Sequence, residues 1–449
     1  MNNEGSNGNY WSSTYNNSSN AYNLNFNSSN VNTNNNNRYY GFTVRAVQHS
    51  LSSAVPFRLT RDRLLQDLYI AFYDARRRKS NKSYVRAFER NLKDELESLC
   101  DDLINRTYKA QPSTCFVINY PKKREVFAAQ FRDRVVHHLY YNYTHVLFER
   151  TFIQDTYSCI KGRGTHYGFH RLASHMRKET QNWQHEAWVM KLDIRGYFMH
   201  IDRQLLANIA LGSIDKMSAH RAVGNKRWDE VIDIDFIKWL TSEIILLNPT
   251  VSCRFAGEES DWIGLDRNKS LFYAPSGCGL PIGNLTSQLF SNVYLNVFDQ
   301  YMKRVMGCKH YGRYVDDAYV VSCDKEWLKS LAMKAKSFLL KTLHLELHLG
   351  KLIISRCNYG TEFLGGYVKP FRNYVSNHTL RRLISRIVLF DLEDKEKVVR
   401  CINSSLGMLR HYRTYHIRRN LFMRKEFLCI SYYNRNITKM YVNNKKVQL

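Results

Sequence analysis

The sequence predicts an α+β protein, and three observations lead to that class. Apolar residues recur at three-to-four spacing between residues 59 and 108, which is typical of amphipathic helices. Two segments, TCFVINYPKKREVFAAQF and KHYGRYVDDAYVVSC, place short strand-like runs on either side of a turn, which is typical of hairpins. With 449 residues, of which 44% are hydrophobic and 13% aromatic, the chain is long and apolar enough to bury a large core.

The N-terminal segment differs in composition from the rest. Sixteen of the first 37 residues are Asn, and Tyr22, Leu24 and Phe26 alternate with Asn as in a strand. We expect residues 1–50 to form an Asn-rich disordered leader, because so short a segment cannot bury a core of its own and therefore does not suit a ligand-binding surface domain. No charged region followed by an apolar one marks the start for secretion, which predicts a cytoplasmic protein.

Between residues 57 and 185 we expect helices and one hairpin. The helical pattern of residues 59–108 is interrupted at Pro112, and the first hairpin follows it. A helix is predicted through RDRVVHHLYYNYTHVLFERTF, and another between the loop KGRGTHYG and about Thr180. His137 and His138 are adjacent in the first of these helices. Because adjacent helical residues point in different directions, packing or exposure explains them better than joint ligand binding.

From residue 186 onward the predicted elements surround a short acidic pattern. AWVMKLD is apolar up to Asp193, as in a buried strand that ends at a site. Residues 204–275 form a long connection that we expect to be partly helical. Beyond it the sequence predicts a helix over 284–303, the YVDD hairpin, a helix in EWLKSLAMKAKSFLLKTL, a strand in EFLGGYVKP and basic helices after residue 376.

The charge of the chain indicates a nucleic-acid partner. Lys and Arg outnumber Asp and Glu by 66 to 40, which gives a net charge of +26 spread from residue 59 to the C-terminus. Basic surface spread along a track neutralises phosphates, whereas a solvated basic surface without a partner is the alternative. No stretch reaches the roughly 18 apolar residues that span a membrane, so we expect no membrane partner. The ten cysteines show no metal-ligand spacing, which favours buried free thiols in a reducing compartment.

Three acidic residues, Asp193, Asp316 and Asp317, form the candidate chemical site. A hairpin centred on VDD would carry Asp316 and Asp317 at its tip, with Val315 and Val320 anchored below. If the strand that ends at Asp193 pairs beside this hairpin, the carboxylates converge. Carboxylates suit Mg²⁺, and two such ions about 4 Å apart can activate a hydroxyl and stabilise a leaving phosphate oxygen. For a DD dipeptide alone, solvated turn acids are the alternative.

The order of the motifs resembles that of the reverse transcriptases over residues 57–420. YVDD resembles their catalytic signature, and MKLDIRGYF resembles the block that carries their first metal-binding Asp. Further matching blocks lie at 119–138, 157–172, 279–288, around Lys351 and at FLGG, residues 363–366. The resemblance implies a right-hand polymerase fold with fingers at 57–185, a palm with an antiparallel sheet at 186–375 including the 204–275 insertion, and a helical thumb with a C-terminal tail at 376–449.

The same resemblance implies roles for individual residues. Asp193 and Asp316 would bind two Mg²⁺ ions, for which Mn²⁺ is a possible substitute, with Asp317 assisting and the backbone carbonyl of Ile194 as a further ligand. The ring of Phe198 would exclude a 2′-hydroxyl, although core packing is an alternative. The implied nucleotide-binding residues are Lys122, Lys123, Arg124, Phe198, Ile282, Gly283, Gln288 and Lys351, of which Lys351 is alternatively a solvated lysine. The implied template–primer contacts are Tyr314, Gly365, Gly366, Arg410 and Arg413, with Arg418 and Arg419 as further duplex contacts.

One block departs from most reverse transcriptases, because GLPIGNLTSQ has Ile282 in place of Gln and Gln288 in place of Pro. Together with FIQDTYSCIKGRGTH and INSSLGMLRHY, this form is similar to the reverse transcriptases of diversity-generating retroelements. Those enzymes copy a template-repeat RNA into cDNA with errors opposite adenine, and the cDNA replaces a variable repeat in a target gene. The resemblance implies as partners dNTPs, template-repeat RNA, the cDNA/RNA duplex and a small basic helical accessory protein.

Two alternatives stay open. One is a reverse transcriptase of the retron, group II intron or phage-defence type, against which the SQ ending and the KGRGTH block speak. The other is a non-catalytic nucleic-acid-binding protein on a polymerase scaffold, against which the complete set of three Asp residues speaks. The leader itself resembles the end of a lectin-like target domain. Because Asn codons begin with two adenines, residues 1 to about 48 are a candidate translated template repeat, with an ordinary Asn-rich leader as the alternative.

Overall fold

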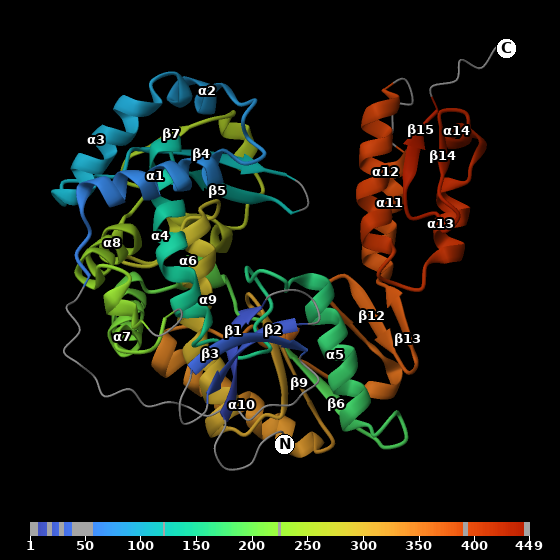
Figure 1. The fold of residues 1–449 in the computed structure, drawn as a ribbon. Coiled ribbons are helices and arrows are strands. Elements are labelled where there is room, and N and C mark those ends of the chain that lie inside the picture. The colour runs from blue at the N-terminus through green and yellow to red at the C-terminus, as the bar shows by residue number, and fades with distance from the viewer. Residues whose placement is uncertain are drawn as a thin grey trace. The chain divides into compact units, whose positions relative to one another are not determined.

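The computed structural model describes residues 8–15, 20–26, 31–37, 57–119, 122–222, 226–388 and 394–443. It separates into two compact units, residues 1–59 with 216–234 and residues 60–215 with 235–449. Figure 1 labels the helices and strands. The second unit contains every residue of the predicted chemical site. Helices and mostly antiparallel strands alternate along the chain, which confirms the α+β class.

Three strands pair near the N-terminus, where a disordered leader was expected. They are β1 (Gly8–Tyr15), β2 (Asn20–Phe26) and β3 (Val31–Asn37). The strands are antiparallel in the order β1-β2-β3, and Leu24 lies opposite both Tyr10 and Thr33. The alternation of Tyr22, Leu24 and Phe26 with Asn falls within β2. Period-two alternation suits a paired strand, so the polar composition that suggested disorder does not prevent strand pairing here.

Helices form the first part of the second unit, as the apolar spacing predicts. They are α1 (Arg61–Arg76), α2 (Ser83–Arg90), α3 (Leu92–Ile104) and α4 (Phe131–Glu149). The side chain of Thr60 caps α1 by accepting a hydrogen bond from the backbone N–H of Arg63. Leu64 and Leu68 are fully buried on α1, which packs against α3 and α4. His137 is buried on α4 and its Nδ1 lies 2.8 Å from Oγ1 of Thr286, so it has the packing role that was one of the two expected for it.

The first predicted hairpin is present and gains a third strand. β4 (Ser113–Ile118) and β5 (Arg124–Ala128) are antiparallel, and β7 (Cys253–Phe255) pairs with β4 in parallel. β7 belongs to the long connection, whose other main elements are α7 (Arg203–Ser218) and α8 (Ile234–Leu246). The connection is thus partly helical as expected, but its parallel strand was not foreseen.

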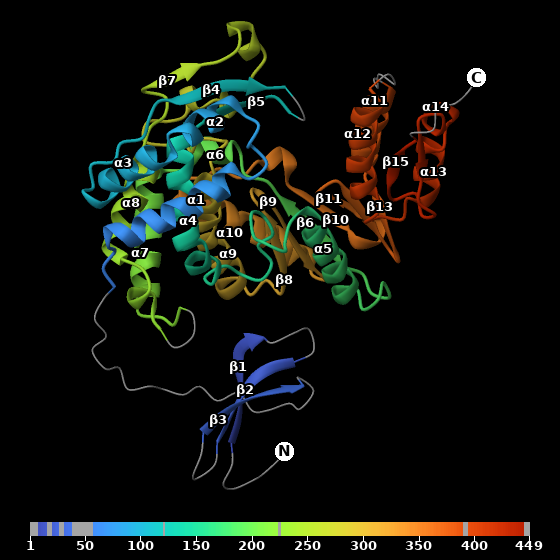
Figure 2. The same cartoon turned by 45° about the horizontal axis from the view of Figure 1, so that its top comes forward.

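The central sheet has four antiparallel strands in the order β10-β6-β9-β8 (Figure 2). Its strands are β6 (Trp188–Leu192), β8 (His310–Tyr314), β9 (Asp317–Ser322) and β10 (Ile353–Arg356). The helices around it are α5 (Thr165–Glu179), α6 (Tyr197–His200), α9 (Leu285–Gln300) and α10 (Lys325–Leu343). Both α5 and α10 contact β9. The antiparallel sheet expected within residues 186–375 is thus present, and the three Asp residues lie at the ends of its strands or in the turn between β8 and β9.

The C-terminal region contains the expected basic helices and two small sheets. The sheets are β11 (Thr361–Phe363), β12 (Gly366–Lys369) and β13 (Arg372–Val375), and β14 (Ser431–Tyr433) with β15 (Met440–Val442). The helices are α11 (Asn377–Val388), α12 (Lys395–Leu409), α13 (Tyr415–Phe422) and α14 (Lys425–Leu428). Phe169 of α5 and Leu406 of α12 belong to one buried cluster, so these helices share a core with the central sheet region. The hairpin β14–β15 was not predicted.

Two further expectations concern the surface and the thiols. Within the described ranges, no helix has the length and apolar character needed to cross a membrane. All ten cysteines are free thiols. Cys159, Cys323 and Cys429 are exposed rather than buried, so the expectation of buried thiols holds for only part of the set.

Candidate active site

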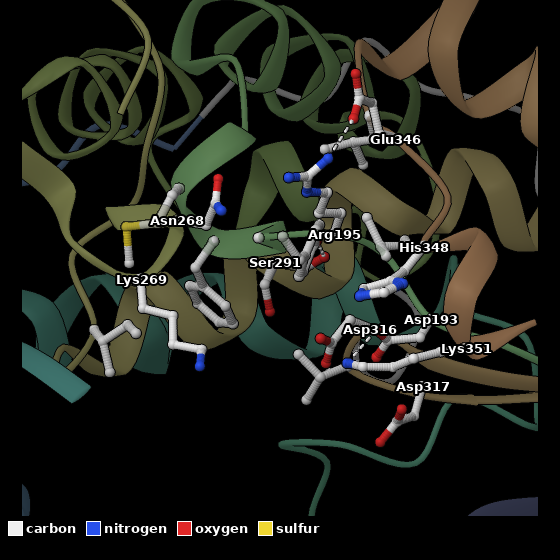
Figure 3. Close-up of a pocket in the computed structure, with 18 of the residues that line it drawn as sticks. Asp193, Arg195, Asn268, Lys269, Ser291, Asp316, Asp317, Glu346, His348 and Lys351 are labelled. Carbon is white, nitrogen blue, oxygen red and sulfur yellow. Dashed lines mark hydrogen bonds and ion pairs between the residues drawn. The ribbon is translucent and has the colours of Figure 1, made fainter. Parts of the chain in front are cut away.

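A cavity of about 1450 Å³ opens beside the central sheet (Figure 3). All three Asp residues line it, and so do the residues expected to bind nucleotide. The predicted residues at its surface are Lys122, Lys123, Arg124, Asp193, Ile194, Phe198, Ile282, Gly283, Gln288, Tyr314, Asp316, Asp317 and Lys351. Gly365, Gly366, Arg410 and Arg413 lie outside the lining. The structure therefore brings together most of the residues that the sequence nominated from separate blocks.

Strand pairing explains how the carboxylates come together. β6 and β9 are antiparallel, and Leu192 at the end of β6 lies opposite Ala318 near the start of β9. Asp193 directly follows Leu192, and Asp317 directly precedes Ala318, so both residues lie at the same end of two adjacent strands. Asp316 occupies the turn before β9. The predicted convergence is confirmed. It arises because β6 ends directly before Asp193 and β9 begins at Asp317.

The turn differs from the prediction in one respect. Tyr314 pairs with Asp317, which leaves Val315 and Asp316 as the two turn residues. Val315 has a φ of 55°. The expectation that Val315 anchors the hairpin below its tip is therefore wrong, because Val315 forms the tip, whereas Val320 is fully buried in β9 as expected.

Burial and the charges of neighbouring carboxylates raise the pKa values of Asp316 and Asp317. Loss of water in the pocket and then the charge of Asp193 raise the pKa of Asp316 above its usual range. Loss of water, followed by the charges of Asp316 and Asp193, raises the pKa of Asp317. The ammonium group of Lys351 donates a hydrogen bond of 2.6 Å to Asp193, and this contact raises the pKa of Lys351. A divalent cation would relieve the remaining repulsion.

The donor set fits Mg²⁺ by its chemistry. Mg²⁺ uses one or two carboxylates and completes its shell with water and substrate phosphates, so it does not need a full cage of protein ligands. In the described part of the chain, no three His, Cys, Asp or Glu side chains form a ready-made metal cluster. Asp193, Asp316 and Asp317 line one cavity and so supply the one or two carboxylates that Mg²⁺ needs. Ile194 also lines the cavity, and its backbone forms a bridge with Leu347.

Basic residues form another part of the cavity surface. Lys122 and Arg124 are exposed there, whereas the ammonium of Lys123 donates a 2.7 Å hydrogen bond to the carbonyl of Ile263. Arg124 lies near enough to Asp316 to lower the pKa of that carboxyl, which partly offsets the effect of burial. Of the three predicted basic residues, Lys122 and Arg124 are thus better placed than Lys123 to meet an incoming phosphate.

An apolar cluster supports the part of the cavity formed by Phe198 and Ile282. Both side chains pack against a buried group that includes Phe127 and Met199. The backbone holds them as well. The N–H of Phe127 donates to the carbonyl of Ile282 at 2.9 Å, and the N–H of Leu280 donates to the carbonyl of Phe198 at 2.8 Å. Gly283 has a φ of 125°, and a Cβ there would lie 2.9 Å from Cγ1 of Val126. Glycine is therefore required at this position by both backbone conformation and space.

The predicted template–primer residues fall into two groups. Tyr314 lines the cavity, and Arg410 and Arg413 are exposed after α12, together with Arg419. Arg418 does not fit the prediction of a duplex contact. It is buried, and its guanidinium donates to the carbonyls of Asn436 and Ile437. A charged group held in this way stabilises the C-terminal fold rather than reaching a phosphate.

Several cavity residues were missed by the sequence reasoning. Asn268 and Lys269 come from the long connection, and Arg195, Glu346 and His348 also line the cavity (Figure 3). The first two are placed by Glu125, a buried carboxylate of β5. Glu125 accepts hydrogen bonds from Trp262 Nε1, Ser270 Oγ and the N–H of Leu271 at 2.7–3.0 Å. This link joins segments more than a hundred residues apart, and a single sequence contains no local signal for it.

Comparison with known proteins yields matches to solved structures only. No protein-family model matches the sequence, and no curated protein is similar to it. The chain is similar to apo telomerase from Candida tropicalis truncated from its C-terminal domain, with a TM-score of 0.42, 11% identity and coverage of 62% of this chain and 59% of that one. It is also similar to telomerase from Candida albicans in complex with a TWJ fragment of telomeric RNA, with a TM-score of 0.43, 9% identity and coverage of 73% and 57%. The chain thus spans less than two thirds of either telomerase chain, and likenesses at this level establish no shared activity.

Proposed function

We propose that this protein is an RNA-directed DNA polymerase that works by two-metal phosphoryl transfer. The observation that carries the proposal is the placement of Asp193, Asp316 and Asp317 at adjacent strand ends in one large cavity that basic residues also line. In such a site two Mg²⁺ ions would supply activation of the primer hydroxyl and stabilisation of the leaving pyrophosphate. The net charge of +26 suits a protein that holds a nucleic-acid duplex.

The protein's own residues would orient the substrates. Asp193 and Asp316 would hold the metal ions, with Asp317 adding charge beside them. Arg124, exposed at the cavity, would contact the triphosphate of the incoming nucleotide, where a cation offsets negative charge that develops during transfer. Nζ of Lys351 lies 2.6 Å from Oδ2 of Asp193 at the cavity surface. From this position the ammonium group would offset the negative charge of the leaving pyrophosphate.

A primer-extension assay tests this function. The full chain would be incubated with an RNA template, a DNA primer, dNTPs and Mg²⁺, and Mn²⁺ would be tested in its place. Asp316→Asn keeps the size of the side chain but removes its charge, and a loss of about 4 kcal/mol in transition-state stabilisation would reduce extension about a thousandfold. Glu326→Gln, at an exposed carboxylate of α10 outside the cavity lining, is the control and should extend normally. Duplex binding without extension by the unaltered chain would instead indicate a non-catalytic binding protein.

We further propose that the enzyme belongs to the diversity-generating type and makes adenine-directed errors in cDNA for mutagenic retrohoming. The proposal rests on the GLPIGNLTSQ form, and the apolar packing of Ile282 at the cavity supports it. A Gln at this place would check the nascent base pair through hydrogen bonds, whereas an apolar side chain rejects a mismatch weakly. Sequencing of extension products should show substitutions concentrated opposite template adenines. An even distribution over the four bases would favour a retron, intron or phage-defence enzyme.

The same proposal covers the leader and the partners. We take residues 1 to about 48 as a translated template repeat, and a small basic helical accessory protein as a partner in cDNA synthesis. The DNA around the coding sequence should then contain a near-copy of the segment encoding residues 10–48, with differences at adenines. Randomly placed differences, or the lack of a near-copy, would contradict this assignment while leaving the polymerase proposal intact.

A further inference from the structure

The backbone of the turn between β8 and β9 has a conformation that its sequence does not favour. Val315 has a φ of 55°. The left-handed region is rarely occupied by β-branched residues, because the Cβ substituents crowd the backbone there. Asn, Asp or Gly would adopt it more readily. A Val that stays in this conformation must be held by contacts from elsewhere in the structure.

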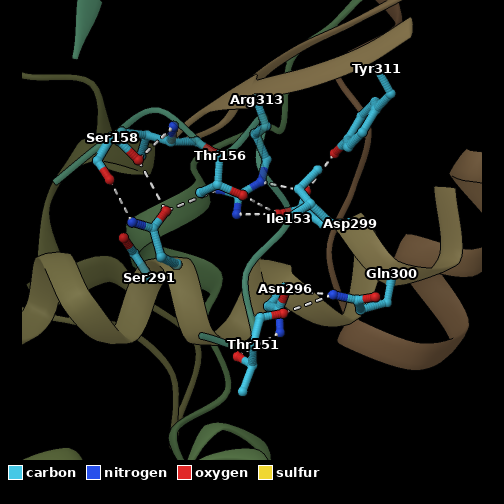
Figure 4. Close-up of polar contacts among 12 residues, drawn as sticks. Thr151, Ile153, Thr156, Ser158, Ser291, Asn296, Asp299, Gln300, Tyr311 and Arg313 are labelled. Carbon is cyan, nitrogen blue, oxygen red and sulfur yellow. Dashed lines mark hydrogen bonds and ion pairs between the residues drawn. The ribbon is translucent and has the colours of Figure 1, made fainter. Parts of the chain in front are cut away.

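Ser158 and Arg313, both labelled in Figure 4, hold the peptide groups on either side of Val315. Its N–H donates to Oγ of Ser158 at 3.2 Å, and its carbonyl accepts a 2.8 Å hydrogen bond from Nη1 of Arg313. Ser158 is nearly fully buried and Arg313 is fully buried. The turn is therefore fixed from both sides by residues that lie below the cavity surface.

The guanidinium of Arg313 is itself fixed by a buried carboxylate. Its Nε and Nη2 each donate a 2.7 Å hydrogen bond to Asp299 of α9, one to each oxygen. Asp299 is fully buried and also accepts hydrogen bonds from the hydroxyls of Tyr311 and Thr156. A buried ion pair adds little net stability, because desolvation opposes the attraction between the charges. It does, however, give the planar guanidinium a single orientation.

Ser158 is fixed in the same way from a neighbouring position on α9. Its hydroxyl donates to Oδ1 of Asn292 at 3.0 Å, and Nδ2 of Asn292 donates back to the carbonyl of Ser158 at 2.8 Å. Nη1 of Arg313 also donates to Oδ1 of Asn292 at 3.3 Å. The contacts on the two sides of Val315 thus meet at one buried amide.

The geometry points to Arg313 and Ser158 as positioning residues that hold Val315 in its left-handed conformation and so direct the Asp316 carboxylate toward Asp193. Asp316 follows Val315 directly, so a rotation of the Val315 peptide would turn the Asp316 side chain. Asp299 and Asn292 hold the two positioning residues in place. The inference rests on the proposed phosphoryl-transfer function, because its consequence is the spacing of the carboxylates. Neither residue touches substrate in this scheme.

The test is a double-variant comparison in the primer-extension assay with the full chain. Ser158→Ala removes the acceptor for the Val315 N–H and should lower kcat about tenfold, with KM for dNTP changed less than about twofold. Val315→Asn places at the turn a residue that adopts positive φ readily. In the Val315→Asn background, the same Ser158→Ala change should lower kcat by no more than about threefold. Ser405→Ala, a buried serine of α12 bonded to the carbonyl of Cys401, is the matched control and should keep normal kcat.

The outcomes separate the two proposals. If the unaltered chain does not extend primers under any metal condition, both the function and the positioning role are wrong. If it does extend them but Ser158→Ala keeps kcat within about twofold, only the positioning role is wrong. An equal kcat loss with and without the Val315→Asn substitution would also overturn the role, because Ser158 would then act independently of the turn. Arg313→Lys provides a second variant. Lysine keeps the charge but lacks the planar set of donors that bonds Asp299 and Val315 together. Because this loss within a buried ion pair endangers folding, the decisive variant is Ser158→Ala.

Discussion

Gly366 allows close packing between the central region and the C-terminal helices, and its substitution should show this directly. It begins β12, and a Cβ at this position would lie 2.6 Å from Cδ2 of Phe169 and 2.7 Å from Cε1 of Tyr412. Carbon atoms in contact normally lie about 3.5–4.0 Å apart, so both rings would have to move by about 1 Å. Phe169 is fully buried and Tyr412 nearly so. Overpacking of this kind costs about 1–3 kcal/mol, and we expect Gly366→Ala to lower the free energy of unfolding by about 2 kcal/mol.

The assay is unfolding in urea, followed by fluorescence and circular dichroism, with a second glycine as the control. Gly407 lies within α12, and a Cβ there would meet no atom within 4 Å. Gly407→Ala should therefore stabilise the protein by about 0.5–1 kcal/mol, because alanine favours a helix interior. Equal midpoints for Gly366→Ala and the unaltered chain would refute the packing argument. If the midpoints were equal but primer binding by Gly366→Ala fell, Gly366 would act as the template–primer contact that the resemblance implies.

Three further predictions concern the cavity and the buried histidines. Phe198→Ala should reduce discrimination against ribonucleotides about 10–100-fold in the ratio of kcat/KM values, and an unchanged ratio would leave Phe198 with a packing role alone. Ile282→Gln should lower the error frequency opposite template adenine, as measured by sequencing, and an unchanged error spectrum would remove Ile282 from the explanation. Burial lowers the pKa of His137 and of His175 to about 4, so the unfolded chain takes up protons first as the pH falls below about 6.5. Each of these two histidines should lower the free energy of unfolding by about 2 kcal/mol at pH 5. The His137→Asn variant should therefore lose less unfolding free energy than the unaltered chain between pH 7 and pH 5. An equal loss in both proteins would contradict this.

The sequence was sufficient for the elements that local patterns define. Apolar periodicity located α1, α4, α9 and α10, and the apolar run before Asp193 located β6. The convergence of Asp193 with Asp316 and Asp317 could be predicted because carboxylates at the ends of neighbouring strands meet when those strands pair. The remaining site residues were nominated by the resemblance to reverse transcriptases rather than by pattern, and the cavity includes most of them.

The features that the sequence did not reveal depend on contacts between distant segments. β7 has three residues and pairs with β4 across more than a hundred positions, so its short run carries no strand signal of its own. Glu125 also depends on a distant segment. Nothing in the neighbouring sequence indicates that its carboxylate is buried and hydrogen-bonded to residues 262–271. Arg418 was misassigned because the sequence of a basic helix does not show which of its basic side chains are exposed and which bond a buried carbonyl.

The pairing beside β8 also bears on how this protein avoids association with other chains. β8 is an edge strand of the central sheet, and an open edge presents unpaired N–H and C=O groups to any strand that approaches. Here the edge is occupied by the protein's own backbone, because the N–H of Arg313 donates to Asp155 and the N–H of Tyr157 donates to Arg313, each at 2.9 Å. The segment from Asp155 to Tyr157 therefore covers the edge of the sheet at Arg313, directly before the turn that contains Val315 and Asp316. Changes that loosen this segment would expose unpaired backbone groups at the edge and would also disturb the candidate active site.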